Sequence, residues 1–313
     1  MGKSEVRLHG PRYTLGETEV HHTEIANLLD RAAEFRMPPT PELWGWGHVR
    51  RTERSLEAMA ADSATATLRA AGADPSSVEA VVLCSTRIPG PSEVHGRFME
   101  TFLTGAGLGD IPFYGQNLNR CVNLLAAIDT ATAFVAAGRY RRVLVVTTDS
   151  AARESDRMVS YALFSDAAAG CLIVADGESD TLADGGYEVL GCATAQDRRT
   201  LDHSNEISAD LARTVNDRLL TPLGGKLGDV AGLMHANIFK PVVVMKERQA
   251  GFTAEQLHTD NIARVGHCFA ADPLINLVDR AALGEIEPGR LYMLAAGVPG
   301  QRIGVLLRSA ERG

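Results

Sequence analysis

The sequence predicts an α/β fold in which two similar halves each carry helices packed on a mainly parallel sheet. From about residue 78 onward, segments rich in β-branched residues alternate with helical segments, which is typical of strands joined by helices that cover a sheet. The order strand, helix, strand, helix, strand, strand occurs twice, which indicates an internal duplication. The 313 residues are 45% hydrophobic, enough for a large core. We therefore expect an N-terminal half at 1–184 and a C-terminal half at 185–313.

The N-terminal half is expected to open with a strand and a helix near 51–71, separated by a loop. The elements that follow are strands at 78–86, 112–117, 141–149 and 169–176 and helices near 92–106 and 121–138. Gly138 is suited to end the second of these helices, because glycine adopts the left-handed C-cap conformation at low cost.

The C-terminal half repeats this order. Its expected elements are strands at 230–237, 261–267, 290–298 and 302–310 and helices at 240–249 and 273–283. The segment 185–228 is expected to connect the halves and to contain one helix near 206–220.

Composition excludes several classes of function. The net charge of −8 comes without any block of lysine or arginine, which argues against a nucleic-acid partner. Neither a membrane-spanning stretch nor a signal peptide is expected, so we predict a cytoplasmic protein with no membrane partner.

The cysteines are scattered, odd in number and never spaced as C-x-x-C, which argues against a disulfide framework and against a zinc site. They are Cys84, Cys121, Cys171, Cys192 and Cys268. No bound metal is predicted.

Cys121 is the candidate nucleophile. It follows a predicted strand and a short polar stretch, and it begins a long apolar helix. A thiol reacts as the thiolate, and the free amide groups at a helix N-terminus favour that form. The alternative is that Cys121 is a small buried hydrophobic residue, as most free cysteines are.

Three further residues are expected to meet Cys121. His235 ends one predicted strand, and His267 and Asp272 lie between another strand and its helix. Because the carboxyl ends of strands in an open α/β sheet gather on one side, all four side chains are expected to converge there.

Several segments together are similar to a known family. The helix headed by Cys121 leads into "AGRYRRVLVVTTDS" and then "LFSDAAAGCLIV", and "HANIFKPV" and "EPGRLYMLAAGVPGQRIGVLLR" follow in order. This pattern resembles the β-ketoacyl carrier-protein synthase III branch of the thiolase superfamily. The resemblance implies a thiolase-like fold, in which duplicated βαβαβαββ halves form five layers, αβαβα. It also implies a homodimer whose substrates are acyl thioesters of coenzyme A or of a phosphopantetheine carrier protein, without a tightly bound cofactor.

One segment departs from the elongating enzymes of that branch. Residues 266–272 read "GHCFAAD" where those enzymes have "GNTSAAS", so His267 replaces an asparagine and Asp272 a small residue. This is similar to acyltransferases of antibiotic biosynthesis, which move an acyl group to a hydroxyl through a cysteine, histidine and aspartate triad.

The resemblance assigns roles to these residues. Cys121 is the nucleophile, His235 the base and Asp272 the group that orients it, while His267 has an active-site role such as donation to the thioester carbonyl. Because Asp272 precedes Pro273, it is alternatively suited to cap a helix N-terminus.

Two binding functions are less defined. In the family, one oxyanion donor comes from a glycine-rich turn; here Pro299 has no N–H, so Gly297 or Val298 is the candidate. Candidate contacts to the coenzyme are Arg153, Arg157 and Trp44, although arginines on loops are usually only solvated.

The predicted function is an acyltransferase of specialised metabolism that works through an acyl-cysteine intermediate. One alternative is a decarboxylating condensing enzyme that uses both histidines. A second is a non-catalytic scaffold that binds a carrier protein.

Overall fold

The computed structural model describes residues 6–88, 90–183, 185–202 and 208–310. Its strands are β1 Val6–Leu15, β2 Thr18–His21, β3 His48–Arg51, β4 Ala80–Cys84, β5 Phe113–Gln116, β6 Arg142–Asp149, β7 Met158–Val159, β8 Ala162–Leu163, β9 Ala167–Ala175, β10 Tyr187–Gln196, β11 Val230–Met234, β12 Leu291–Val298 and β13 Gln301–Ser309. Its α-helices are α1 Leu28–Glu34, α2 Pro41–Trp44, α3 Leu56–Ala71, α4 His95–Gly105, α5 Asn123–Ala136, α6 Asp176–Ser179, α7 Ala209–Leu220, α8 Lys240–Gln249, α9 Asp260–Val265 and α10 Asp272–Ala282.

Nine strands form one continuous sheet in the order β11-β12-β13-β10-β1-β9-β6-β4-β5. β4 pairs in parallel with β5 and β6, and β11 pairs in parallel with β12. The other neighbours in this sheet are antiparallel. The expectation of a mainly parallel sheet is therefore wrong, because two antiparallel strands, β1 and β10, join the halves at the centre.

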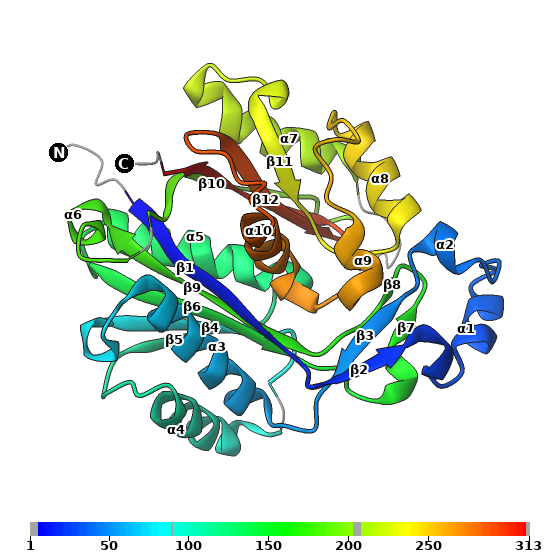
Figure 1. Cartoon of the computed structure of the whole chain (residues 1–313), viewed down its shortest axis with the longest axis horizontal. Helices are drawn as coiled ribbons and strands as arrows, with labels where there is room; N and C mark the ends of the chain where they lie inside the picture. Colours follow the sequence, from blue (N-terminus) through cyan, green and yellow to red (C-terminus); the bar gives the residue numbers. More distant parts are fainter. Residues whose placement is uncertain (1–5, 89, 184, 203–207, 311–313) are drawn as a thin grey trace.

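The elements are layered as the five-layer expectation requires (Figure 1). α3 packs on β1, β6 and β9, with α4 beside it, and α7 packs on β10 and β13 at the opposite side. α5 and α10 lie between the two parts of the sheet, where their apolar faces share one large core with strands from both halves. This central layer places the N-termini of α5 and α10 close to one another.

α5 shows why the sequence folds this way at the site. Leu124, Ile128, Ala131 and Val135 are fully or almost fully buried, a spacing that puts them on one helical face toward the core. Gly138 has a φ of 68° and lets the chain turn into β6, which confirms the sequence prediction.

Two predictions about the C-terminal half are wrong. Residues 261–267 were expected to be a strand, but α9 covers most of them; Ile262 and Val265, three positions apart, are both buried, and this is helical spacing. Residues 185–228 were expected to be a connection, but they contain β10, whose register shifts between Val189 and Gly191 and hides the alternating pattern. The helix expected near 206–220 is α7, and 206–207 lie outside the described residues.

None of the helices within the described ranges has both the length and the apolar character that a membrane crossing requires.

Candidate active site

Cys121 lies on a 3-10 turn, Arg120–Val122, directly before α5, and its side chain is half-buried. Arg120 has a φ of 54°, a left-handed conformation that is unusual for a residue with a side chain. Its guanidinium donates to the carbonyl of Pro299 at 2.6 Å. Asn123 donates to the Ser85 carbonyl at 3.0 Å. The turn is thus fixed on both sides of the sulfur.

His267 is held by its backbone against β8. Its N–H donates to the carbonyl of Leu163 at 2.8 Å, and its carbonyl accepts from the N–H of Ser165 at 2.9 Å. The ring packs against that of Phe164 with centroids 4.9 Å apart. The side chain is 1% exposed.

Asp272 is the first residue of α10, and its carboxylate is fully buried. His267 Nδ1 lies 2.5 Å from Asp272 Oδ2. The backbone N–H of Asn237 donates to the same oxygen at 2.6 Å, and the N–H of Cys268 donates to Oδ1 at 2.7 Å. The helix N-cap is Ala271, so the alternative of Asp272 as an N-cap is wrong.

The pKa of His267 reflects this partner. Burial acts to lower it, but the charge and hydrogen bond of Asp272, followed by the interaction with Cys121, raise the pKa to about 10. Nε2 of His267 has no hydrogen-bond partner by distance and angle within the described residues, and Cys121 nevertheless lies near enough to contribute to the raised pKa of the ring. The ring is therefore an imidazolium at neutral pH.

His235 follows β11 and has no exposed surface. Its Nδ1 lies 2.9 Å from the carbonyl oxygen of Ala236, which requires the proton on Nδ1 and leaves Nε2 as an acceptor. Nε2 has no partner among the residues described. Burial lowers the pKa of His235, so this ring is neutral at neutral pH.

The sequence placed Asp272 beside His235, and the structure places it beside His267. The two pairs are nevertheless linked, since the side chain of Asn276 donates to the carbonyl of His235 at 2.8 Å and to Asn237 Oδ1 at 3.0 Å. Cys121 and His267 line one cavity and His267 contacts Asp272, whereas His235 does not line that cavity and its Nδ1 contacts a backbone carbonyl. The histidine that contacts the carboxylate is therefore not the expected one.

A cavity of about 340 Å³ opens at Cys121 and His267. Its lining is largely apolar and comes from both halves of the chain. The lining residues are Cys121, Ser160, Tyr161, Ala236, Ile238, Val242, Met245, Lys246, His267, Gly297, Val298 and Pro299. The candidate turn of Gly297 and Val298 therefore shares a cavity with the sulfur.

Two titratable residues of the cavity lining were not predicted from the sequence. Tyr161 forms part of the two-residue turn between β7 and β8, and burial together with the charge of Cys121 raises its pKa to about 12. Lys246 lies on α8, and burial lowers its pKa to about 8. The short turn in "VSYA" is a weak sequence signal for Tyr161. The sequence around Lys246 carries no such signal.

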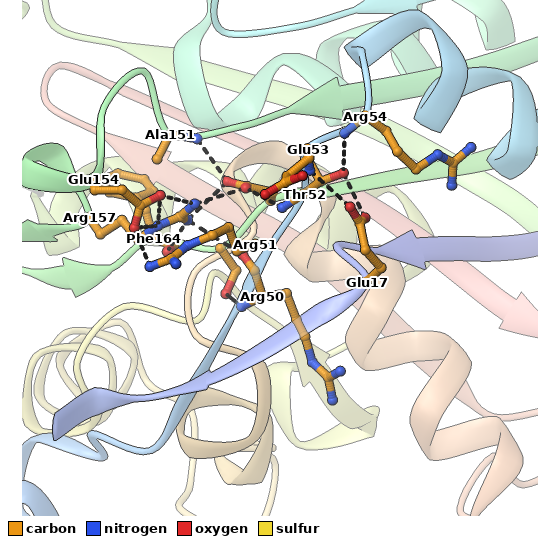
Figure 2. Close-up of polar contacts among 12 residues, drawn as sticks. Glu17, Arg50, Arg51, Thr52, Glu53, Arg54, Ala151, Glu154, Arg157 and Phe164 are labelled. Atoms are coloured by element: carbon orange, nitrogen blue, oxygen red, sulfur yellow. Dashed lines mark hydrogen bonds and ion pairs between the residues drawn. The ribbon is translucent and has the colours of Figure 1, made fainter. Parts of the chain in front are cut away.

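The predicted coenzyme contacts do not gather at this cavity. The Arg157 side chain is 2% exposed and binds Asp166 and Glu154 (Figure 2). The prediction that Arg157 contacts a coenzyme phosphate is wrong, because its guanidinium is buried and already paired. Arg153 is exposed and pairs with Asp156 at 3.0 Å. Trp44 donates its indole N–H to the Pro38 carbonyl at 2.9 Å and packs on Phe239.

No cluster of three or more histidine, cysteine or acidic side chains suited to a metal ion occurs in the part of the chain that the structure describes.

Comparison with known proteins gives a family match for part of the chain. Residues 118–188 match the family model of 3-oxoacyl-[acyl-carrier-protein] synthase III. No protein in the curated set matches the chain.

Solved structures match over almost the whole length. ChlB3, described as an acyltransferase, is 15% identical, with a TM-score of 0.81 and 98% of each chain covered. The 3-oxoacyl-[acyl-carrier-protein] synthase III of Aquifex aeolicus is 18% identical, with a TM-score of 0.77 over 97% of this chain and 99% of that one. OleA of Xanthomonas campestris, with bound lauric acid and lauroyl-CoA, is 14% identical, with a TM-score of 0.81 over 98% and 99%.

The chain therefore has a thiolase-like fold, as predicted from the sequence. The resemblance to the synthase III branch is confirmed by the family model over 118–188, the segment that carries Cys121.

Proposed function

We propose that the protein is an acyltransferase that moves an acyl group from a thioester donor to a hydroxyl acceptor through an acyl-Cys121 intermediate. One observation carries the proposal: Cys121 and His267 line the same cavity, and His267 is bonded to the buried carboxylate of Asp272. A thiol, an imidazole and a carboxylate in this order are the parts of a nucleophilic acyl-transfer site.

In the first half-reaction, the Cys121 thiolate attacks the carbonyl carbon of the donor thioester. A carbon–sulfur bond forms to Cys121, and the electron pair of the carbonyl moves to oxygen. Collapse of this intermediate expels the donor thiolate, which takes a proton from the His267 imidazolium. The pKa of about 10 keeps that proton available at neutral pH.

In the second half-reaction, the now neutral His267 accepts the proton of the acceptor hydroxyl. The oxygen attacks the acyl-cysteine carbonyl and forms the ester, and the Cys121 thiolate leaves. Asp272 holds the ring through Nδ1 and stabilises the imidazolium that forms. His267 thus takes the role that sequence analysis gave to His235.

His235 is the neutral member of the site in this proposal. Its Nε2 is free to accept a hydrogen bond, and its backbone carbonyl is tied to Asn276. We therefore expect His235 to contribute little to the rate of acyl transfer. Gly297 and Val298 remain the candidates for a backbone donor to the oxyanion, because they lie at the same cavity as the sulfur.

The buried carboxylate paired with His267 supports transfer rather than condensation. Decarboxylation of a malonyl unit generates a carbanion, and the charge of Asp272 would repel it in a site of low dielectric constant. Release of carbon dioxide from a malonyl thioester would therefore overturn the proposal in favour of the decarboxylating alternative.

The donor proposed is an acyl thioester of coenzyme A or of a carrier protein, and the acceptor is a hydroxyl compound of antibiotic biosynthesis in the cytoplasm. ChlB3, described as an acyltransferase, has the same fold, which supports this choice. A homodimer is also proposed. β5 is an edge strand. Phe113 within it and Leu118 shortly after it are exposed, as a strand that pairs with a second copy would be.

Intact-protein mass spectrometry after mixing with a panel of acyl thioesters tests the proposal. We expect one added acyl mass in the wild type and none in Cys121→Ala. An unmodified wild-type protein across the panel would support the non-catalytic scaffold instead.

A further inference from the structure

We propose that Tyr161 is a further catalytic residue, whose phenolic O–H donates a hydrogen bond to the carbonyl oxygen of the thioester as that oxygen becomes negative. The inference rests on the proposed function, because it requires that Cys121 is acylated. Tyr161 would be a side-chain donor to the oxyanion, in addition to the backbone donor proposed at Gly297 or Val298.

The position of Tyr161 at the cavity is the first argument. Ser160 and Tyr161 form the tip of a hairpin between β7 and β8, and both line the cavity with Cys121 and His267. The ring of Tyr161 lies edge-on to that of His267, with centroids 6.4 Å apart. Its hydroxyl has no hydrogen-bond partner in the ranges that the structure describes, so it is free to bind a substrate.

The hairpin that carries Tyr161 is fixed at its base. The N–H of Phe164 donates to the Arg157 carbonyl at 2.7 Å, and Arg157 Nη1 donates back to the Phe164 carbonyl at 3.2 Å. Arg157 is held by two hydrogen bonds to Asp166, at 3.0 and 2.9 Å. Figure 2 shows the Arg157 guanidinium enclosed between the acidic side chain of Glu154 and the backbone of Phe164.

The tip of the hairpin is fixed as well. The N–H of Phe239 donates to the carbonyl of Tyr161 at 2.7 Å, which ties the turn to the segment between β11 and α8. Phe164, at the end of the hairpin, packs on His267. The β7–β8 hairpin therefore positions both Tyr161, the proposed hydrogen-bond donor, and His267, the proposed acid–base group, as a preorganised site requires.

The chemistry of the phenol fits this role. Burial, and then the charge of Cys121, raise the pKa of Tyr161 to about 12, so it keeps its proton throughout the neutral range. When Cys121 attacks, the carbonyl electron pair moves to oxygen and the phenol donates to that oxygen without losing its proton. When the intermediate collapses, the pair returns and the hydrogen bond weakens.

The glycine-rich turn supports the need for such a donor. Pro299, which lines the cavity, has no N–H and cannot donate. A side-chain hydroxyl on the facing hairpin would supply the contact that this turn is unable to make at that position.

The test is the rate of acylation of Tyr161→Phe, with acetyl and hexanoyl N-acetylcysteamine thioesters as probes. Released thiol gives the rate, and intact mass confirms the adduct on Cys121. We expect a rate at saturating thioester about 100-fold below the wild type, with the half-saturating concentration unchanged, because one oxyanion donor contributes about that factor. The control is Tyr13→Phe, which loses a phenol bonded to Asp279 at 2.6 Å outside the cavity lining, and which should match the wild type.

A Tyr161→Phe rate within threefold of the wild type would overturn the inference while the adduct on wild-type Cys121 upholds the proposed function. So would an effect confined to the half-saturating concentration, which indicates ground-state binding alone. A wild-type protein that takes up no acyl group overturns both.

Discussion

The end of β11 and the turn before α10 each carry a buried histidine, and the two rings are in opposite electrostatic states. Burial lowers the pKa of His235, whose Nδ1 contacts only a backbone carbonyl. The pKa of His267 is raised to about 10 by the carboxylate of Asp272 and by Cys121, despite equal burial. Burial alone therefore does not determine the charge of an imidazole here; the contact at Nδ1 does.

This difference in charge gives His235 and His267 different roles, which the sequence alone did not distinguish. A neutral ring with a free Nε2 can accept a hydrogen bond, while an imidazolium beside a sulfur can deliver a proton to a leaving thiol.

The largest effect is expected for His267→Gln. Removal of the ring paired with Asp272 should reduce the rate constant for acyl transfer about 1,000-fold, since general acid–base catalysis contributes factors of this order. The measurement is steady-state thiol release from a donor that acylates the wild type. A loss in His235→Gln equal to that in His267→Gln would contradict the comparison and return the base to His235.

Asp272→Asn should have the next largest effect, a rate about 100-fold lower. Loss of the carboxylate removes the main cause of the raised pKa of His267, so its titration midpoint should move from about 10 toward the ordinary value near 6.5. NMR of histidine-labelled protein measures that midpoint directly. Asp279→Asn, a change at a carboxylate of α10 bonded to Tyr13, is the matched control and should leave the midpoint in place.

The raised pKa of His267 also predicts a pH dependence of stability. The folded-state pKa of about 10 lies above the unfolded value near 6.5, so the native state binds the proton more tightly. The stabilisation is fully present below pH 6.5 and is lost as the pH rises to about 10. Urea denaturation at pH 7 and pH 10 should show this loss in the wild type, and a smaller one in His267→Gln. If the free energy of unfolding fell equally in the wild type and in His267→Gln between pH 7 and pH 10, this prediction would be refuted.

His235→Asn should have the smallest effect. Asparagine can retain a donor toward the Ala236 carbonyl, so the rate should fall by less than about tenfold, in line with the net value of one hydrogen bond, about 1 kcal/mol. Thiol release from His235→Asn and His267→Gln under the same conditions gives the ratio of the two losses in rate.

Much of the fold could be predicted from sequence because its signals are local. Strand β6 and helix α8 have continuous patterns that end at clear boundaries, and α8 spans Lys240–Gln249 as expected. β10 could not be predicted in the same way, since its register shift at Gly191 breaks the alternation. α9 was mistaken for a strand because Ile262 and Val265 are β-branched, although their spacing is helical.

Candidate members of the site could also be proposed from the sequence, but their pairing could not. Cys121, His267 and Asp272 stand at the ends of predicted elements, where polar residues attract notice. The choice of histidine depends on the turn Phe269–Ala271, where Phe269 has a φ of 54° and brings Asp272 back toward His267. Tyr161 was missed because its importance comes from packing between segments far apart in the chain.

The bond from Arg120 to the carbonyl of Pro299 has a consequence for how the protein matures in the cell. Arg120 holds a left-handed backbone that costs about 1–3 kcal/mol on its own, and the group that secures it is synthesised 179 residues later. We therefore expect the turn that carries Cys121 to reach this geometry only after the last hairpin, β12–β13, has been synthesised.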